Sequence, residues 1–190
     1  STSRGLGDVY KRQVLKDTVK TEEAMPGMQA EEGHHHGYSR FADSDVRDRN
    51  LSDWDGEWQS VYPYLQEGIL DEVMERKAEN GNKTAEGYRA YYETGYKTDV
   101  SKITINAENN TMCFVKNGVE AKAAYQYKGY QIYDYKSGSR GVRYFFEATD
   151  GDADAPKYVQ FSDHGIAPGK AEHFHIYFCL LYTSDAADEG

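Results

Sequence analysis

The sequence is poor in cysteine, has fewer basic than acidic residues, and contains no long apolar run. Of its two cysteines, Cys179 lies in a segment excluded below, so Cys113 has no partner for an intrachain disulfide and the redox compartment stays open. The formal net charge of −10 disfavours nucleic acids and anionic membranes, because both bind basic surfaces. No stretch reaches the roughly 18 apolar residues of a transmembrane helix. We expect neither a nucleic-acid partner nor a transmembrane segment.

Both ends of the chain look foreign to the protein. Residues 8–13 (DVYKRQ) and 179–184 (CLLYTS) can be encoded by DNA sequences that are reverse complements of each other, one base out of frame. The wider ends resemble translations of the transposase adapters that are ligated to DNA fragments for sequencing. We therefore expect residues 1–13 and 179–190 to be adapter-derived and non-native, and residues 14–178 to be an internal fragment of a longer gene.

Between these ends, a polar segment precedes a domain. Residues 14–40 lack sustained periodicity and contain His34, His35 and His36, which predicts a flexible, histidine-containing linker or tail. Residues 41–178 are long enough to bury a core as one domain. Within it, a short helix is expected after Asp43, and a first strand or its approach over residues 56–64. Apolar spacing predicts a helix over residues 65–77, and Thr84 can cap another that ends at Gly95.

The second half of the domain has the pattern of an all-β protein. Short segments rich in β-branched and aromatic residues alternate with Asn, Gly and Asp turns. The expected strands cover residues 102–106, 111–115, 121–127, 130–135, 142–148, 157–161 and 172–178. The links between strands are too short for parallel crossovers, so we predict an antiparallel meander whose closure into a barrel would remove the sheet edges. The predicted fold is mainly β, with two or three short helices.

The histidines form two groups, His34–His36 in the polar tail and a second group near the end of the domain. In the last predicted strand, His173 and His175 share one face because side chains alternate along a strand. An antiparallel return would bring His164 beside them. Three neutral imidazoles converging from two strands suit zinc, which binds histidine nitrogen at roughly 2.0–2.1 Å. The alternative is that these are ordinary, partly buried histidines; we favour a metal site because the histidines cluster.

Three long stretches of the domain resemble the ZinT-like zinc-binding family. They are LSDWDGEWQSVYPYL (residues 51–65), YKSGSRGVRYFFEATD (residues 135–150) and KYVQFSDHGIAPGKAEHFHIYF (residues 157–178). The resemblance covers residues 41–178 and implies a lipocalin/calycin-like barrel. It places the family's metal ligands on His164, His173 and His175, with His34, His35 and His36 as an auxiliary histidine-rich motif. The family continues past this point into a Trp-Pro-Thr-Tyr-Tyr segment that is absent here, which implies a C-terminally truncated domain.

The resemblance also implies a function. It indicates a periplasmic or cell-surface bacterial protein that scavenges zinc, with cadmium as an occasional occupant, and delivers it to the binding protein of a zinc ABC importer. On this reading the chain binds metal and catalyses nothing. Two alternatives stay open: a zinc-dependent hydratase or hydrolase, because three histidines and an open water can activate water, and a lipocalin-type carrier, which would need an apolar cavity.

Overall fold

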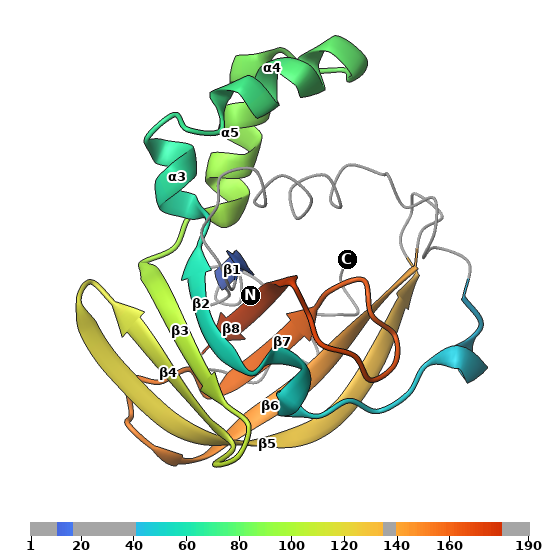
Figure 1. Cartoon of the computed structure of the whole chain (residues 1–190), viewed down its shortest axis with the longest axis vertical. Helices are drawn as coiled ribbons and strands as arrows, with labels where there is room; N and C mark the ends of the chain where they lie inside the picture. Colours follow the sequence, from blue (N-terminus) through green and yellow to red (C-terminus); the bar gives the residue numbers. More distant parts are fainter. Residues whose placement is uncertain (1–10, 17–40, 135–139, 180–190) are drawn as a thin grey trace, which may run out of the picture.

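The strands follow one another around the sheet in chain order. In the structure, a computed structural model that describes residues 11–16, 41–134 and 140–179, each strand pairs antiparallel with the next, and β1 also pairs with β8. The described strands therefore form a closed barrel (Figure 1), and the predicted mainly β, antiparallel barrel is confirmed. The strands are β1 (Lys11–Lys16), β2 (Gly56–Ser60), β3 (Val100–Asn106), β4 (Thr111–Lys116), β5 (Val119–Asp134), β6 (Arg140–Gly151), β7 (Tyr158–Ser162) and β8 (His173–Cys179).

Aromatic side chains fill the interior of the barrel. Trp54 ends the 3-10 helix η3 (Leu51–Trp54) and stacks on Phe161 of β7, with ring centroids 4.5 Å apart. Trp58 of β2 meets Phe174 of β8 edge-on at the same separation. All four side chains are fully buried, and the Trp58 Nε1–H donates a hydrogen bond to the Trp54 carbonyl at 2.7 Å. Both tryptophans therefore belong to the core of the barrel.

Three helices stand together at one end of the barrel (Figure 1). They are α3 (Tyr62–Gln66), α4 (Asp71–Asn80) and α5 (Ala85–Tyr96), and their buried residues form a second hydrophobic cluster that includes Leu65, Met74 and Tyr92. The predicted cap is present, because the Thr84 hydroxyl accepts a hydrogen bond from the Gly87 amide at 3.0 Å. Among the described residues, no helix is long and apolar enough to cross a membrane.

Two predicted elements have different boundaries in the structure. The single helix expected over residues 65–77 is two helices, because Gly68 adopts a left-handed φ of 77° between α3 and α4. α3 also takes up Tyr62–Tyr64, which had been assigned to the first strand or its approach. The two strands expected over residues 121–127 and 130–135 are one strand, β5, because a register shift between Tyr127 and Gly129 absorbs the extra residue as a bulge.

The structure also contains two elements near its N-terminal side. η2 (Asp43–Asp45) is the short helix expected after Asp43. β1 was not expected, because no strand was predicted before residue 56; its pairing partners lie in β2 and β8, far away in the chain. The rest of the predicted tail, with His34, His35 and His36, and residues 1–10 and 180–190 lie outside the described residues. The proposed division of the chain therefore stays a prediction.

Candidate metal centre

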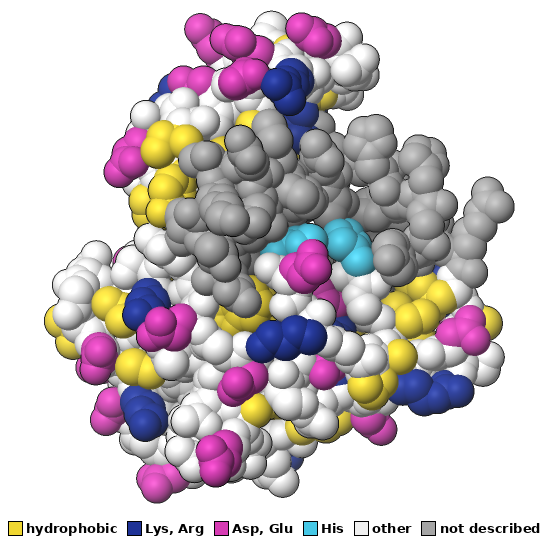
Figure 2. All heavy atoms as spheres, viewed as in Figure 1, with side chains coloured by type: hydrophobic (Ala, Val, Ile, Leu, Met, Phe, Trp, Pro, Cys, Tyr) yellow, Lys and Arg dark blue, Asp and Glu magenta, His cyan; other side chains and the backbone are white. Residues whose placement is uncertain are grey.

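β8 separates its side chains into two faces, as predicted. Phe174, Ile176 and Phe178 point into the barrel and are buried in its core. His173 and His175 alternate with them and therefore project from the opposite side of the strand. His173 is partly buried, and His175 is 7% exposed. Histidine side chains show together at one place on the surface in Figure 2.

His164 and His173 lie next to each other. His164 belongs to the loop between β7 and β8, and its ring centroid is 5.9 Å from that of His173. Two imidazoles that bind one zinc ion tetrahedrally, with Zn–N bonds of about 2.0–2.1 Å, have ring centres about 5 Å apart. The pair is therefore spaced within about an ångström of what one shared zinc ion requires. The expected return of the chain, which brings His164 beside β8, is present.

His175 is not gathered into the same group. Its ring lies 6.2 Å from that of Tyr96, the last residue of α5. Among the described residues, no set of three or more His, Cys, Asp or Glu side chains is close enough to hold a metal ion. The backbones of His173 and His175 are roughly 6.6 Å apart along the strand, and both side chains project from the same face of β8. The structure thus brings together two of the three predicted ligands.

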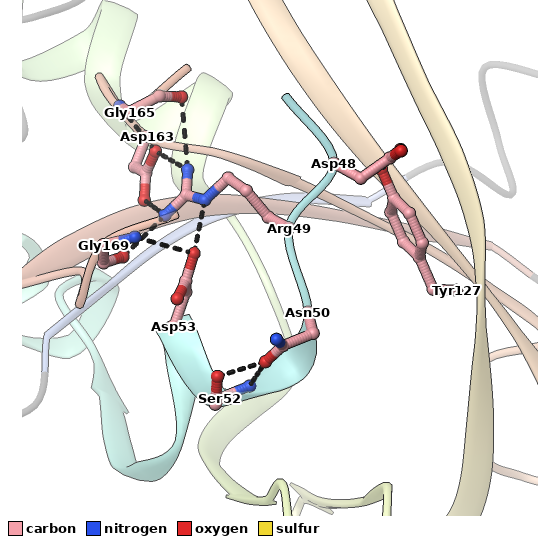
Figure 3. Close-up of polar contacts among 9 residues, drawn as sticks. All are labelled: Asp48, Arg49, Asn50, Ser52, Asp53, Tyr127, Asp163, Gly165 and Gly169. Atoms are coloured by element: carbon pink, nitrogen blue, oxygen red, sulfur yellow. Dashed lines mark hydrogen bonds and ion pairs between the residues drawn. The ribbon is translucent and has the colours of Figure 1, made fainter. Parts of the chain in front are cut away.

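A buried arginine holds the loop that carries His164. Arg49 lies just before η3 and donates hydrogen bonds to both carboxylate oxygens of Asp163, at 2.6 and 2.9 Å (Figure 3). It also donates to the carbonyls of Gly165 at 3.1 Å and Gly169 at 3.0 Å. Its Nε–H donates to Asp53 at 2.7 Å. The loop between β7 and β8 is therefore attached to η3 on both sides of His164.

The electrostatics of this cluster keep Arg49 charged. Burial lowers the pKa of the Arg49 guanidinium, but hydrogen bonds and charge attraction from Asp163 and Asp53 outweigh it, so that this pKa is raised above its ordinary value. The guanidinium carbon also lies 4.3 Å from the ring centre of Trp54. Arg49 was not predicted from the sequence. Its only local signal is the pair Arg49 and Asp53 at helical spacing, which is common on solvated surfaces.

The carboxylate next to His164 is already engaged by other groups. Both oxygens of Asp163 accept hydrogen bonds from Arg49, and one of them also accepts from the Gly165 amide at 2.7 Å. Glu172, the residue before β8, is exposed. Two surface hollows are lined by described residues, one around residues 104–108 and the other around residues 148–157, and neither has a histidine in its wall. The barrel interior itself is filled by aromatic side chains, which disfavours a carrier of apolar ligands.

Comparisons with known proteins agree on one family. Residues 32–187 match the family model described as ZinT (YodA) periplasmic lipocalin-like zinc-recruitment. The chain is 51% identical over 181 residues to the zinc-binding protein AdcA of Streptococcus pyogenes serotype M1, covering 93% of this chain and 32% of that protein. It is 53% identical over 139 residues to the probable metal-binding protein YrpE of Bacillus subtilis, covering 73% of this chain and 55% of that protein.

A solved structure extends the comparison to the fold. The crystal structure of the Zn(II)-bound ZinT-like domain of Streptococcus pneumoniae AdcA superposes with a TM-score of 0.73 at 52% identity, covering 80% of this chain and 83% of that one. The chain spans about a third of the length of the AdcA proteins that it matches.

Proposed function

Since the chain belongs to the ZinT family of periplasmic lipocalin-like zinc-recruitment proteins, we propose that it binds Zn²⁺ through His164, His173 and His175. The ion is the cargo of the protein, captured for a zinc uptake system. The observation that carries the proposal is the pair of rings of His164 and His173, 5.9 Å apart, on a loop and a strand that are both fixed to the barrel.

The three histidines have different tasks in this proposal. His164 and His173 form the first half of the site without rearrangement. His175 completes it by turning from its place beside Tyr96. A fourth position is filled by a histidine of the group His34–His36, by a carboxylate, or by water, as tetrahedral zinc requires four ligands.

The relatives support the cargo and suggest the location. Both AdcA proteins of the streptococci are named as zinc-binding, and that of Streptococcus pneumoniae as a lipoprotein. We propose an extracytoplasmic protein that passes zinc to the binding protein of an importer. Cd²⁺, which prefers similar ligands, is expected to occupy the same site. We further propose that the role is binding without catalysis, because both carboxylate oxygens of Asp163 are engaged by Arg49.

The function is tested by zinc titration against a chromophoric chelator. The intact chain should bind one Zn²⁺ tightly. Each of His164→Ala, His173→Ala and His175→Ala should weaken binding by at least about 100-fold, more than the 10–100-fold typical of residues outside the coordination sphere. Replacing His34, His35 and His36 by alanine is the matched control: it removes as many imidazoles and should weaken binding without abolishing it. Tight binding that survives the triple replacement of His164, His173 and His175 would place the site elsewhere.

The same titration at different pH values identifies the type of ligand. Imidazole binds metal only when neutral, and its ordinary pKa is about 6.5. Protons therefore compete with zinc below that pH, and the apparent affinity should fall steeply between pH 7.5 and 5. An affinity that stays constant over this range would contradict a histidine site and point to carboxylate ligands.

A further inference from the structure

The buried guanidinium of Arg49 holds the loop between β7 and β8 through hydrogen bonds. We infer that Arg49 is the positioning residue of the zinc site: by clamping the loop at Asp163, Gly165 and Gly169, it fixes His164 at the distance from His173 that the ion requires. This inference rests on the proposed function and adds to it a residue that does not itself touch the ion.

The contacts of Arg49 bracket His164 closely. Asp163, the residue before His164, receives two hydrogen bonds from the guanidinium, and the carbonyl of Gly165, the residue after it, receives a third. These contacts leave the backbone at residue 164 little freedom to shift. Figure 3 shows Asp163, Gly165 and Gly169 of the loop converging on the guanidinium of Arg49.

Asp53 continues the clamp toward β8. Its carboxylate accepts from the Arg49 Nε–H at 2.7 Å and from the Gly169 amide at 3.1 Å. Its backbone carbonyl accepts from the Ala171 amide at 2.7 Å, two residues before His173. The network therefore reaches from one side of His164 to the start of the strand that carries His173. The loop that carries His164 and the start of the strand that carries His173 are thus both hydrogen-bonded to Arg49 or to Asp53 of η3.

Burial gives the clamp its stiffness. The side chains of Arg49, Asp53 and Asp163 are 1%, 10% and 7% exposed, and the guanidinium also lies 5.0 Å from the ring centre of Tyr144 in the barrel core. A buried ion cluster contributes little net stability, because desolvation offsets the attraction. Here its five hydrogen bonds fix the Arg49 side chain relative to Asp53, Asp163 and the carbonyls of the two glycines. A rigid geometry is what a metal site needs, since Zn–N bonds vary by only about 0.1 Å.

The test uses a double-mutant cycle between Arg49 and His164. In Arg49→Lys the positive charge is kept, which protects the fold, but a lysine cannot reach Asp53, both oxygens of Asp163 and two carbonyls at once. Zn²⁺ affinity of the full chain should fall about 10–100-fold. In the His164→Ala background the same replacement should change affinity less than about 2-fold, because the group that Arg49 positions is gone.

A control separates positioning from general loss of structure. Arg140 also donates to two aspartates, Asp134 and Asp43, and to a backbone carbonyl, that of Phe41. None of these partners is in the loop between β7 and β8. Arg140→Lys should therefore leave Zn²⁺ affinity unchanged, and melting temperatures of both lysine variants without metal show whether they fold.

A second variant, Gly165→Ala, tests the positioning role of Arg49 if Arg49→Lys does not fold. A methyl group at Gly165 would lie 2.7 Å from Arg49 Nη1 and 3.0 Å from Asp163 Oδ1, so Gly165→Ala displaces the clamp without removing a charge. It should also weaken zinc binding only when His164 is present.

The outcomes are distinct. No loss of affinity in Arg49→Lys or Gly165→Ala, or an equal loss with and without His164, overturns the positioning role while zinc binding stands. If the unaltered chain does not bind zinc, or if His164→Ala binds as tightly as the unaltered chain, the site assignment fails, and the positioning role fails with it.

Discussion

At the scale of single residues, the stability of the barrel depends on a few large aromatic side chains. Phe161 is fully buried and touches three other rings of the core. Its ring centroid lies 4.5 Å from that of Trp54, 5.2 Å from that of Phe174 and 5.4 Å from that of Phe146. It also directly precedes the stretch that leads to Asp163. The same residue therefore fills the core and lies in β7, the strand that leads into the loop of the metal site.

We predict that Phe161→Ala lowers the free energy of unfolding by about 3–5 kcal/mol, because it removes a buried ring and leaves a cavity that the neighbours cannot fill. Urea unfolding followed by tryptophan fluorescence would measure this. Val119→Ala is the control: Val119 is 67% exposed, so its truncation should change the same quantity by less than about 0.5 kcal/mol. Similar effects of the two variants would contradict a close-packed interior.

At the scale of elements, the boundaries of the helices depend on glycine as well as on the spacing of apolar residues. Gly68 separates α3 from α4 with a φ of 77°, a conformation that other residues adopt only at a cost. A methyl group there would also lie 2.9 Å from a carboxylate oxygen of Asp71. Gly95, in the last turn of α5, has neither constraint, since nothing lies within 4 Å of the corresponding position.

Opposite effects are expected from the same substitution at these two glycines. Gly68→Ala should destabilise the protein by about 1–3 kcal/mol through backbone strain. Gly95→Ala should stabilise it by about 0.5–1 kcal/mol, because alanine loses less conformational entropy in a helix. Chemical denaturation of both variants beside the unaltered chain measures the difference. A neutral or stabilising effect of Gly68→Ala would show that the break between α3 and α4 does not depend on Gly68.

At the scale of the whole molecule, the barrel buries tyrosines whose ionisation the folded state disfavours. Burial raises the pKa of Tyr144 to about 12, and it also raises the pKa of Tyr125, whose hydroxyl donates to the Pro156 carbonyl at 2.6 Å. In the unfolded chain a tyrosine has its ordinary pKa of about 10. The neutral form is thus the one that folding favours.

This difference sets a pH range for the loss of stability. A pKa that is higher in the folded state contributes stability that is fully present below about pH 10 and is lost as the pH rises toward 12. Melting temperatures should therefore be constant from pH 8 to 9.5 and fall above pH 10. Tyr144→Phe, which cannot ionise, should show a shallower fall over the same range. An identical profile for this variant would show that Tyr144 does not contribute to the alkaline transition.

Local sequence patterns predicted much of the architecture. Alternation along residues 172–178 identified the face of β8 that bears His173 and His175, and turn residues located most strands of the barrel, because both depend on neighbours in the chain. The break at Gly68 and the bulge near Gly129 were not predicted. A glycine in a sequence does not reveal its φ, which is decided by the elements on either side.

The sequence by itself determined which side chains could bind a metal, because histidine is the common zinc ligand and clustering along the chain is visible without a structure. Only the tertiary structure decided how they meet: His164 beside His173, and His175 beside Tyr96. It also decided that Arg49 holds Asp163 across 114 residues of sequence. Periodicity reports on residues a few positions apart, whereas a contact over such a separation exists only once the barrel has closed and brought η3 against the loop between β7 and β8.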